Sequence, residues 1–312
     1  MRVCSWLRAE PSAVRRLYAT EEAHWRDVLH WDTGQQWREV EQARRSGALP
    51  GLMAVGDDGR IRGWAYYLPE DGVLQLGGLV ADTPEVTEGL LAGLLAGGDA
   101  GEADAVSGFV AERAAGLATA FGRRGFEVDP FHYLTLDLAE TPGPVHAPPG
   151  GTLALGRWRT DAVPAVGALF RSAYSRRIGR YFAPHDRPDE WTRYATNLVA
   201  QPGCGQFRPD LSLLAGESQA PGGVLLMTSL DARTAHVAQL AVGPAWRRQQ
   251  VARTMVAEAV RRARAAGFRR ITLLVADANG PARALYAGMG FVARAGFVAA
   301  FRGSVRPVRL AG

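Results

Sequence analysis

A basic turn joins an apolar, strand-like stretch to a long amphipathic stretch in the sequence LAVGPAWRRQQVARTMVAEAVRRARAAG, residues 240–267. Arg247, Arg248 and Arg253 stand where a helix would begin. A helix start carries unsatisfied backbone N–H groups and the positive end of the helix dipole, so this turn is suited to an anion such as a pyrophosphate. On charge alone, a solvated basic face explains the arginines equally well.

The periodicity around this turn predicts a mixed α/β layer structure in the second half of the chain. The predicted strands cover residues 152–158, 211–216, 223–229, 235–242 and 270–276, with closing strands to about 302. The predicted helices cover residues 161–175, 188–200, 247–266 and 280–288. The basic turn therefore lies between a strand and the helix that follows it.

Two stretches of this half resemble the GCN5-related N-acetyltransferase (GNAT) family. The run RRQQVA at 247–252, preceded by QLAVGPAW, is similar to the family's acetyl-CoA motif Gln/Arg-x-x-Gly-x-Gly/Ala, with Gln250 in the place of the central glycine. The run NGPARALYAGMGF at 279–291 looks like the family's Asn-x-x-Ala-x-x-x-Tyr-x-x-x-Gly-Phe segment. The resemblance implies two tandem GNAT-like domains, each a mixed, mostly antiparallel sheet flanked by helices. It also implies acetyl-CoA as acyl donor and direct attack by a primary amine of a small molecule or peptide.

The resemblance places a general acid at Tyr286, which would protonate the coenzyme A sulfur, and a general base at His236, where relatives carry a glutamate. An unperturbed histidine pKa near 6.5 suits proton acceptance near neutral pH. Simple packing of either side chain is the alternative. Period-two alternation puts Gln239 on the opposite side of the strand from His236, which makes it a poorer candidate for the base.

Contacts to the cofactor follow from the same resemblance. The expected cofactor-binding residues are Leu240, Ala241, Val242, Arg247, Arg248, Gln249, Gln250, Val251, Ala252, Arg253 and Asn279. Donation from the 248–253 stretch is a backbone property, so it survives the replacement of glycine by Gln250. Asn279 would hold the pantetheine arm, although an asparagine at a loop end also bonds its own backbone.

The acceptor site is expected on the first two helices and the loop between them, RSAYSRRIGRYFAPHDRPDEW. Tyr174, Tyr181 and His185 are the candidate acceptor contacts. Aromatic side chains here favour a lined pocket, and the arginines favour an acidic acceptor. An exposed loop without a ligand is the alternative.

The first half of the chain repeats the strand and helix order of the second half. Matching Leu79 to Leu240 gives an offset of 161, and matching Phe126 to Phe291 gives 165, which indicates duplication of one fold. The Pro/Gly-rich run at 141–151 is predicted as a linker between a domain at 1–140 and a domain at 152–312.

The first copy is predicted to be degenerate. The stretch ADTPEV replaces the basic turn, and its carboxylates would repel a pyrophosphate. Phe121 stands at the place of Tyr286 and has no proton to give. Three tryptophans near the start of this copy, Trp25, Trp31 and Trp37, are expected to pack in its core.

Composition limits the remaining chemistry. The 312 residues contain no lysine, so Schiff-base catalysis and a P-loop phosphate site are excluded. Two cysteines are too few for a disulfide framework or a thiolate metal site, and we expect no metal. A formal charge of +5 favours anionic partners. Without an apolar run long enough to span a membrane or a signal peptide pattern, we expect a cytoplasmic protein with no membrane partner.

Two other functions stay open at this point. Tandem folds of this kind occur in aminoacyl-tRNA-dependent transferases, and the basic run RRARAAGFRR would suit RNA phosphate, although the coenzyme A segment argues against nucleic acid. A non-catalytic acyl-CoA-binding or sensing module is the second alternative. Either a monomer or a homodimer is compatible with the sequence.

Overall fold

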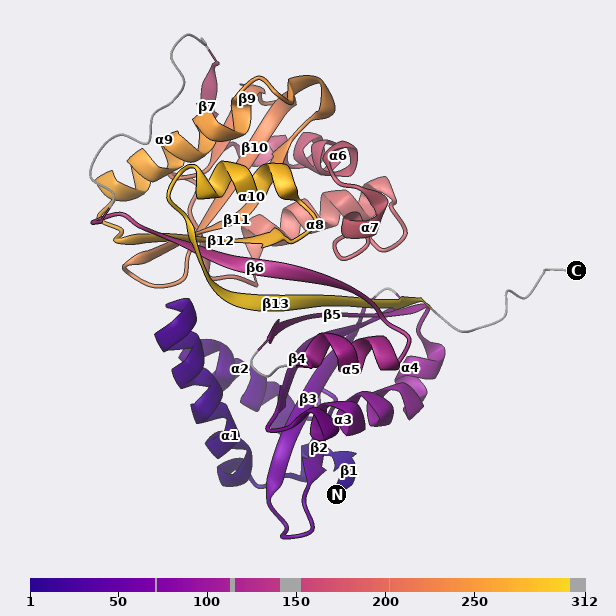
Figure 1. Cartoon of the computed structure of the whole chain (residues 1–312). Helices are drawn as coiled ribbons and strands as arrows, with labels where there is room; N and C mark the ends of the chain where they lie inside the picture. Colours follow the sequence, from indigo (N-terminus) through magenta and orange to yellow (C-terminus); the bar gives the residue numbers. More distant parts are fainter. Residues whose placement is uncertain (71, 113–115, 141–152, 202, 304–312) are drawn as a thin grey trace, which may run out of the picture. The chain divides into compact units, whose positions relative to one another are not determined.

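A computed structural model describes residues 1–70, 72–112, 116–140, 153–201 and 203–303. The chain divides into two compact units (Figure 1). Unit 1 comprises Met1–His132, Ala276–Ala278 and the chain from Ala295 onward, and unit 2 comprises Tyr133–Val275 and Asn279–Arg294. Each unit is a mixed sheet flanked by helices, which confirms the predicted fold class. The predicted linker at 141–151 lies outside the described residues.

Unit 2 contains the strand and helix order predicted for the second half. Its strand order is β6-β12-β11-β10-β9-β7, and β8 pairs with β10. The strands are β6 (Glu127–Asp137), β7 (Leu155–Arg157), β8 (Gln206–Phe207), β9 (Leu213–Glu217), β10 (Ala220–Ser229), β11 (Thr234–Val242) and β12 (Arg270–Ala276). The helices are α6 (Val163–Ala173), α7 (Arg176–Gly179), α8 (Pro188–Ala200), α9 (Val251–Ala265) and α10 (Gly280–Ala287). The predicted helix at 247–266 begins only at Val251.

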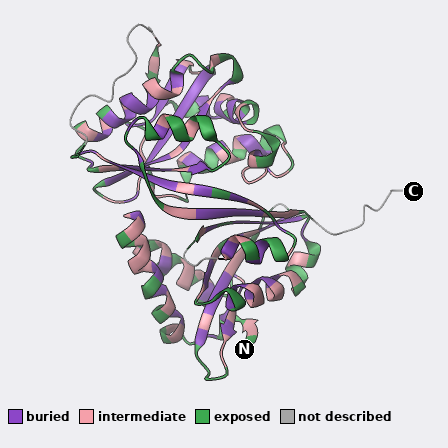
Figure 2. Cartoon of the chain, viewed as in Figure 1, coloured by how far each residue is buried: buried purple, intermediate pink, exposed green. Residues whose placement is uncertain are grey.

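Helices cover both faces of the sheet in unit 2. Alternation along β10 sends Leu225 to the core under α9 and α10, and Leu226 to the core under α6 and α8. Met255 of α9 and Phe170 of α6 complete the two cores and are fully buried. Figure 2 shows the buried strands between helices whose outer faces are exposed. The sheet is therefore apolar on both faces, and polar side chains within it stand out.

Unit 1 also has helices packed on both faces of its sheet. Its strand order is β1-β2-β3-β4-β5-β13-β6. The strands that it adds are β1 (Arg2–Ser5), β2 (Gly51–Val55), β3 (Ile61–Glu70), β4 (Val73–Ala81), β5 (Ala105–Glu112) and β13 (Val292–Gly303). The helices are α1 (Pro11–His24), α2 (Gly34–Arg45), α3 (Pro84–Ala96), α4 (Gly98–Glu102) and α5 (Leu117–Arg123). Trp31 and Trp37 are buried, as expected, and Trp25 is half-buried with its ring edge-on to Trp31 at 5.0 Å.

Strand pairing supports the duplication. β4 pairs in parallel with β5 from Val73 to Leu76, and β11 pairs in parallel with β12 from Thr234 to Val237. Val73 and Thr234 are separated by the offset of 161 found in the sequence. Each copy also has one unpaired, bulged residue at the corresponding place, Gly77 in β4 and Ala238 in β11. The two copies therefore share the irregularity of the sheet as well as its order.

The units are not the continuous stretches 1–140 and 152–312. Gly296–Gly303 of β13 pair with β5, and Val298 lies in the core of unit 1. In the other direction, Leu134 and Leu136 of β6 lie in the core of unit 2. Each half of the chain therefore gives part of its last strand to the other unit. Linker composition cannot reveal this exchange, because an alternating strand pairs equally well with any compatible sheet edge.

Gly167 sets the approach of α6 and α8 in unit 2. A Cβ placed on this glycine would lie 2.9 Å from the Cα and 3.0 Å from the backbone nitrogen of Thr192. Backbone atoms cannot rotate away as a flexible side chain can, so the two helices pack this closely only with glycine at 167. These helices carry aromatic side chains toward the sheet, as described below.

We predict that Gly167→Ala lowers the free energy of unfolding by about 1–3 kcal/mol, because α6 and α8 must separate to admit the methyl group. Urea denaturation followed by circular dichroism measures this change. Gly122→Ala on α5 is the matched control, because a Cβ there meets nothing within 4 Å. Equal stability of the wild type and Gly167→Ala would show that the contact is not tight.

Candidate functional site

Strands β11 and β12 separate at the end of their shared ladder. Their parallel pairing ends at Val237 and Leu273, although β11 continues to Val242 and β12 to Ala276. Over Gln239–Val242, β11 is paired with β10 and with no other strand among the described residues. Backbone groups of β11 that face away from β10 are thus left for another partner, as a bound chain-like ligand would provide. The expected contact of Leu240–Val242 with the cofactor stays a prediction.

The basic turn has an unusual backbone. Arg248 and Gln250 have φ of 61° and 62°, in the left-handed region that glycine favours, and Gln249 between them does not. Alternation of this kind turns successive N–H groups toward a common concavity that attracts anions. Within the described chain, the N–H groups of residues 249–253 bond no acceptor, and the first bond of α9 runs from Thr254 to Gln250. The turn therefore has donors for an anion at a helix start.

Two side chains hold the turn in place. The Trp246 indole lies on Gly222 of β10, where a Cβ would come within 2.1 Å of the ring. Arg247 donates from Nη2 to the Ala173 carbonyl at 2.8 Å and from Nε to the Val242 carbonyl at 3.4 Å. Arg247 thus neutralises the carbonyl end of α6 and connects it to the end of β11. The Arg247 guanidinium thus binds backbone carbonyls of the protein itself. Arg248 is exposed and forms no ion pair with a carboxylate that the structure describes.

His236 is buried on β11, with only 3% of its surface exposed. Its Nδ1 lies 2.8 Å from the Thr272 hydroxyl, and its ring stacks on Tyr133 at 6.2 Å. The Thr272 hydroxyl also donates to the Ala235 carbonyl at 3.4 Å. Burial lowers the pKa of His236 from 6.5 to about 4. The imidazole is therefore neutral near pH 7 and a weaker base than an exposed histidine.

Gln239 lies on the same face of β11 as His236, so the alternation argument for the opposite face was wrong. The unpaired Ala238 is a bulge, which resets the alternation of side chains along the strand. Val237 and Leu240 consequently both pack under α9, and Gln239 turns toward α6 and α8. A period-two pattern in the sequence cannot reveal a bulge. Here the bulge turns the Gln239 amide into the candidate site.

Gln239 connects two phenols. Its Oε1 accepts a hydrogen bond from Tyr174, and its Nε2 donates one to Tyr194. Burial raises the pKa of both tyrosines above the ordinary value near 10, so both stay protonated at neutral pH. Tyr174 follows α6 directly, and Tyr194 lies on α8. Sequence reasoning set Gln239 aside and missed Tyr194, and the signal for both was an amide flanked by apolar residues in the strand.

Tyr286 is buried on α10 and packs edge-on against Phe291 at 5.6 Å. Burial raises the pKa of its phenol, so Tyr286 keeps its proton near pH 7. A retained proton is what a general acid needs, and packing in the core is equally evident.

The remaining predicted residues have clear local contacts. Asn279 caps α10, with its Oδ1 accepting from the Ala282 N–H at 3.2 Å, so its side-chain NH₂ is the group left to contact a ligand. Tyr181 lies under the Arg180 guanidinium at 5.3 Å. His185 lies 2.6 Å from Glu190 through Nδ1. Of the three acceptor candidates, Tyr174 bonds Gln239.

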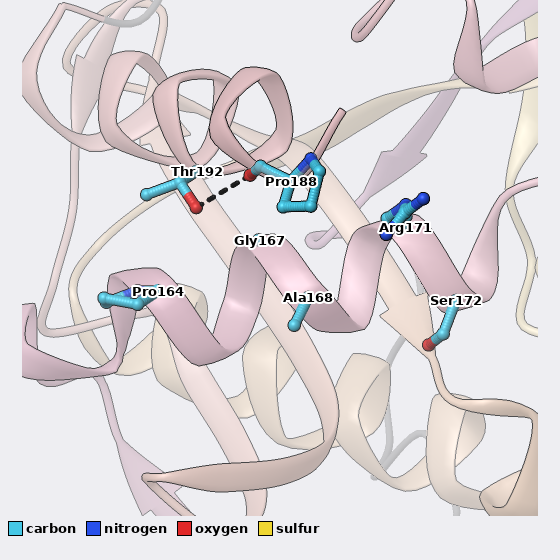
Figure 3. Close-up of a pocket in the computed structure, with 7 residues that line it drawn as sticks. All are labelled: Pro164, Gly167, Ala168, Arg171, Ser172, Pro188 and Thr192. Atoms are coloured by element: carbon cyan, nitrogen blue, oxygen red, sulfur yellow. Dashed lines mark hydrogen bonds between the residues drawn. The ribbon is translucent and has the colours of Figure 1, made fainter. Parts of the chain in front are cut away.

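A surface groove lies between α6 and α8, with a volume of about 440 Å³. Figure 3 shows its lining side chains on the two helices, near the close approach at Gly167. The lining residues are Pro164, Gly167, Ala168, Arg171, Ser172, Pro188 and Thr192. None of the predicted site residues lines this groove, so we do not place the reaction there.

The equivalent turn in unit 1 differs in chemistry. Helix α3 begins directly after Thr83, whose side chain accepts from the Val86 N–H at 3.4 Å, and Pro84 has no N–H to donate. Asp82 lies 3.6 Å from Arg62, and Glu85 adds a second carboxylate. Unlike the turn before α9, this helix start uses its own side chain as a cap and repels anions.

Phe121 repeats the position of Tyr286. It is fully buried and meets Phe126 edge-on at 5.1 Å, as Tyr286 meets Phe291. The ring is retained, but the hydroxyl is absent. Among the residues that the structure describes, no group of three or more His, Cys, Asp and Glu side chains forms a metal site, and no helix is long and apolar enough to cross a membrane.

Known proteins give independent evidence on this fold. Residues 170–291 match the model of the acetyltransferase (GNAT) family. A GCN5-related N-acetyltransferase from Sphaerobacter thermophilus has a TM-score of 0.66 at 17% identity, covering 98% of this chain and 96% of its own. A tandem GNAT protein from the clavulanic acid biosynthesis pathway has a TM-score of 0.52 at 15% identity, covering 83% of this chain and 84% of its own.

A glucosamine N-acetyltransferase region of a fungal multi-domain β-N-acetylglucosaminidase has a TM-score of 0.60 at 15% identity, covering 96% of this chain and 38% of its own. No curated protein matches the sequence. At these identities the solved structures show the fold alone, whereas the family model matches the segment that contains the parted strands, the basic turn and Tyr286. This chain therefore has the GNAT fold and carries an acetyltransferase domain of the GNAT family at residues 170–291.

Proposed function

We propose that unit 2 is an acetyl-CoA-dependent N-acetyltransferase acting on a primary amine of a small molecule or peptide. The turn before α9 carries this proposal, because consecutive backbone donors without an acceptor in the described chain stand at a helix start. Backbone N–H groups and the helix dipole both favour the pyrophosphate of coenzyme A. The parted β11 and Asn279 are the groups that would hold the pantetheine arm.

When bound, acetyl-CoA supplies a thioester: the amine nitrogen bonds to the acetyl carbon, the carbon–sulfur bond breaks, and an N-acetyl amide and coenzyme A thiol result. Tyr286 gives its Oη proton to the departing sulfur and regains one from solvent. His236 takes the proton that the amine loses, at Nε2 or through water, and passes it to solvent. Because the pKa of His236 is about 4, the imidazole holds this proton only briefly before releasing it.

Gln250 offers a test of the cofactor site. We predict that a saturating excess of acetyl-CoA, about 100 times Kd, stabilises the wild type by about 2.7 kcal/mol. Gln250→Gly should bind at least as tightly, because glycine adopts φ of 62° without strain. Gln250→Ile should weaken binding tenfold or more, because a branched side chain resists this conformation. Thermal melting with and without acetyl-CoA measures all three, and no shift for the wild type would overturn the proposed function.

Tyr286→Phe tests the general acid. The variant keeps the buried ring but loses the hydroxyl, so we predict a fall in kcat of about 100-fold with an unchanged Kd for acetyl-CoA. Release of free thiol gives the rate, and calorimetric titration gives the Kd. Phe291→Leu is the control for packing against this ring. Full activity of Tyr286→Phe would remove the hydroxyl from the chemistry.

His236 makes stability depend on pH. Its pKa is lower in the folded chain than in the unfolded chain, so its contribution is complete above pH 6.5 and is lost as the pH falls toward 4. The unfolding free energy of the wild type should therefore fall between pH 6.5 and pH 4. We predict that in His236→Asn this fall is smaller by about 3 kcal/mol. Urea denaturation at pH 7, 5.5 and 4 gives the difference between wild type and variant, which cancels the other groups. Parallel pH profiles would mean that His236 is not buried as a neutral group.

A further inference from the structure

Five aromatic rings of unit 2 form one connected surface, which we call the aromatic wall: Phe170, Tyr174, Phe182, Trp191 and Tyr194. Tyr174 stacks on Trp191 with centroids 5.9 Å apart and planes 8° apart. Phe182 stacks on Tyr194 at 4.8 Å and meets Tyr174 at 5.2 Å. Tyr174, Phe182 and Tyr194 are each partly exposed, so the wall is an accessible surface as well as part of the core.

The wall adjoins the parted strand through Gln239. This amide accepts from Tyr174 and donates to Tyr194, which fixes the orientation of both phenols. The same residue follows the bulge on β11, directly before the stretch at 240–242 that is expected to contact the acyl donor. Arg247 adds a second connection, because it bonds the carbonyl of Ala173 next to Tyr174. The aromatic wall therefore stands beside the candidate acyl-donor site within unit 2.

The wall offers no unpaired carboxylate from the described loop and helix that carry it. Asp186 accepts from the Trp191 indole at 2.9 Å and lies 3.4 Å from Arg171. Glu190 lies 2.6 Å from His185, and Asp189 lies 3.6 Å from Arg187. Since these anions already have partners, a polycation gains little here. The rings of the wall present aromatic surface and phenol groups to a ligand, and the same loop also carries Arg176, Arg177 and Arg180, which repel a polycation.

We propose that the aromatic wall binds an acceptor whose primary amine is carried on an aromatic body, and that Gln239 is the residue that positions the wall. This inference rests on the proposed function, since it names the acceptor class of the same site. Ring stacking provides the selectivity, because an aromatic body gains contact with the wall that a sugar or an aliphatic diamine does not.

The aromatic surface of the wall also suits the reaction. An amine attacks through its lone pair, and a low-polarity site disfavours the ammonium form, so binding beside the wall lowers the pKa of the amine. In the transfer itself the nitrogen–carbon bond forms, the carbon–sulfur bond breaks, the amine gives up one proton and the sulfur receives one. Gln239 stays neutral throughout, which a carboxylate at the same place would not.

The experiment compares three amines at equal acetyl-CoA: 2-phenylethylamine, glucosamine and putrescine. Thiol release gives kcat/KM for each. We predict that 2-phenylethylamine exceeds both others by at least tenfold. Phe182→Ala should lower kcat/KM for 2-phenylethylamine roughly five- to tenfold and leave the Kd of acetyl-CoA unchanged, because one partly exposed stacking ring is lost.

Gln239→Glu tests the positioning role. A carboxylate between the two phenols should favour ammonium groups, so we predict that the ratio of kcat/KM for 2-phenylethylamine to that for putrescine falls at least tenfold, and that the pH optimum rises. Gln206→Glu, at an exposed position on β8, is the matched control and should change neither. If Gln239→Glu does not fold, as judged by circular dichroism, the Phe182→Ala comparison still decides the proposal.

The outcomes separate the two proposals. If acetyl-CoA shifts the melting temperature but glucosamine or putrescine reacts as fast as 2-phenylethylamine, the aromatic acceptor is wrong and the transferase stands. If Phe182→Ala leaves kcat/KM for 2-phenylethylamine unchanged relative to that for putrescine, the proposed role of the aromatic wall is also wrong. If acetyl-CoA does not bind the wild type, the proposed function fails and this inference fails with it.

Discussion

The separation of β11 from β12 after Val237 is the constraint on which the candidate site depends. Two parallel strands that part leave backbone polar groups without a ladder partner, and such groups need another partner. The bulge at Ala238 lies at the same point and turns Gln239 toward α6 and α8. Tyr286 comes from the opposite face, where α9 and α10 pack. One irregularity of the sheet thus brings the parted strand end and Gln239 together.

Low polarity determines the charge of the groups around this strand end. Burial raises the pKa of Tyr174 and Tyr286 and lowers that of His236 to about 4, so each is neutral near pH 7. The fixed positive character lies at the turn before α9, where backbone donors and Arg248 stand. In the proposed function, an anionic cofactor tail and a neutral reacting centre would thus be separated along one strand and the helix that follows. This arrangement is consistent with transfer between two uncharged groups.

Unit 1 shows that the sheet geometry and core packing can be kept without the polar residues of the candidate site. It repeats the parallel ladder, its early end and the bulge, at Gly77. At the start of α3, however, Thr83 supplies a side-chain cap, and Phe121 keeps the packing of Tyr286 without its hydroxyl. Strand pairing and core packing need only apolar side chains of suitable volume, so they persist after polar groups are lost. The fold of this unit therefore says little about activity.

Periodicity predicted the strands and helices of unit 2 because their buried faces alternate regularly. Prediction failed where the backbone departs from regular geometry: at the bulge beside Gln239, at the left-handed Gln250 and in the exchange of β6 and β13. Glutamine has no preference for positive φ, so no residue type marks that turn. Gln239 did carry a signal. A buried amide needs hydrogen-bond partners on its own face, so a glutamine flanked by apolar residues in a strand predicts polar groups on the helices that cover it.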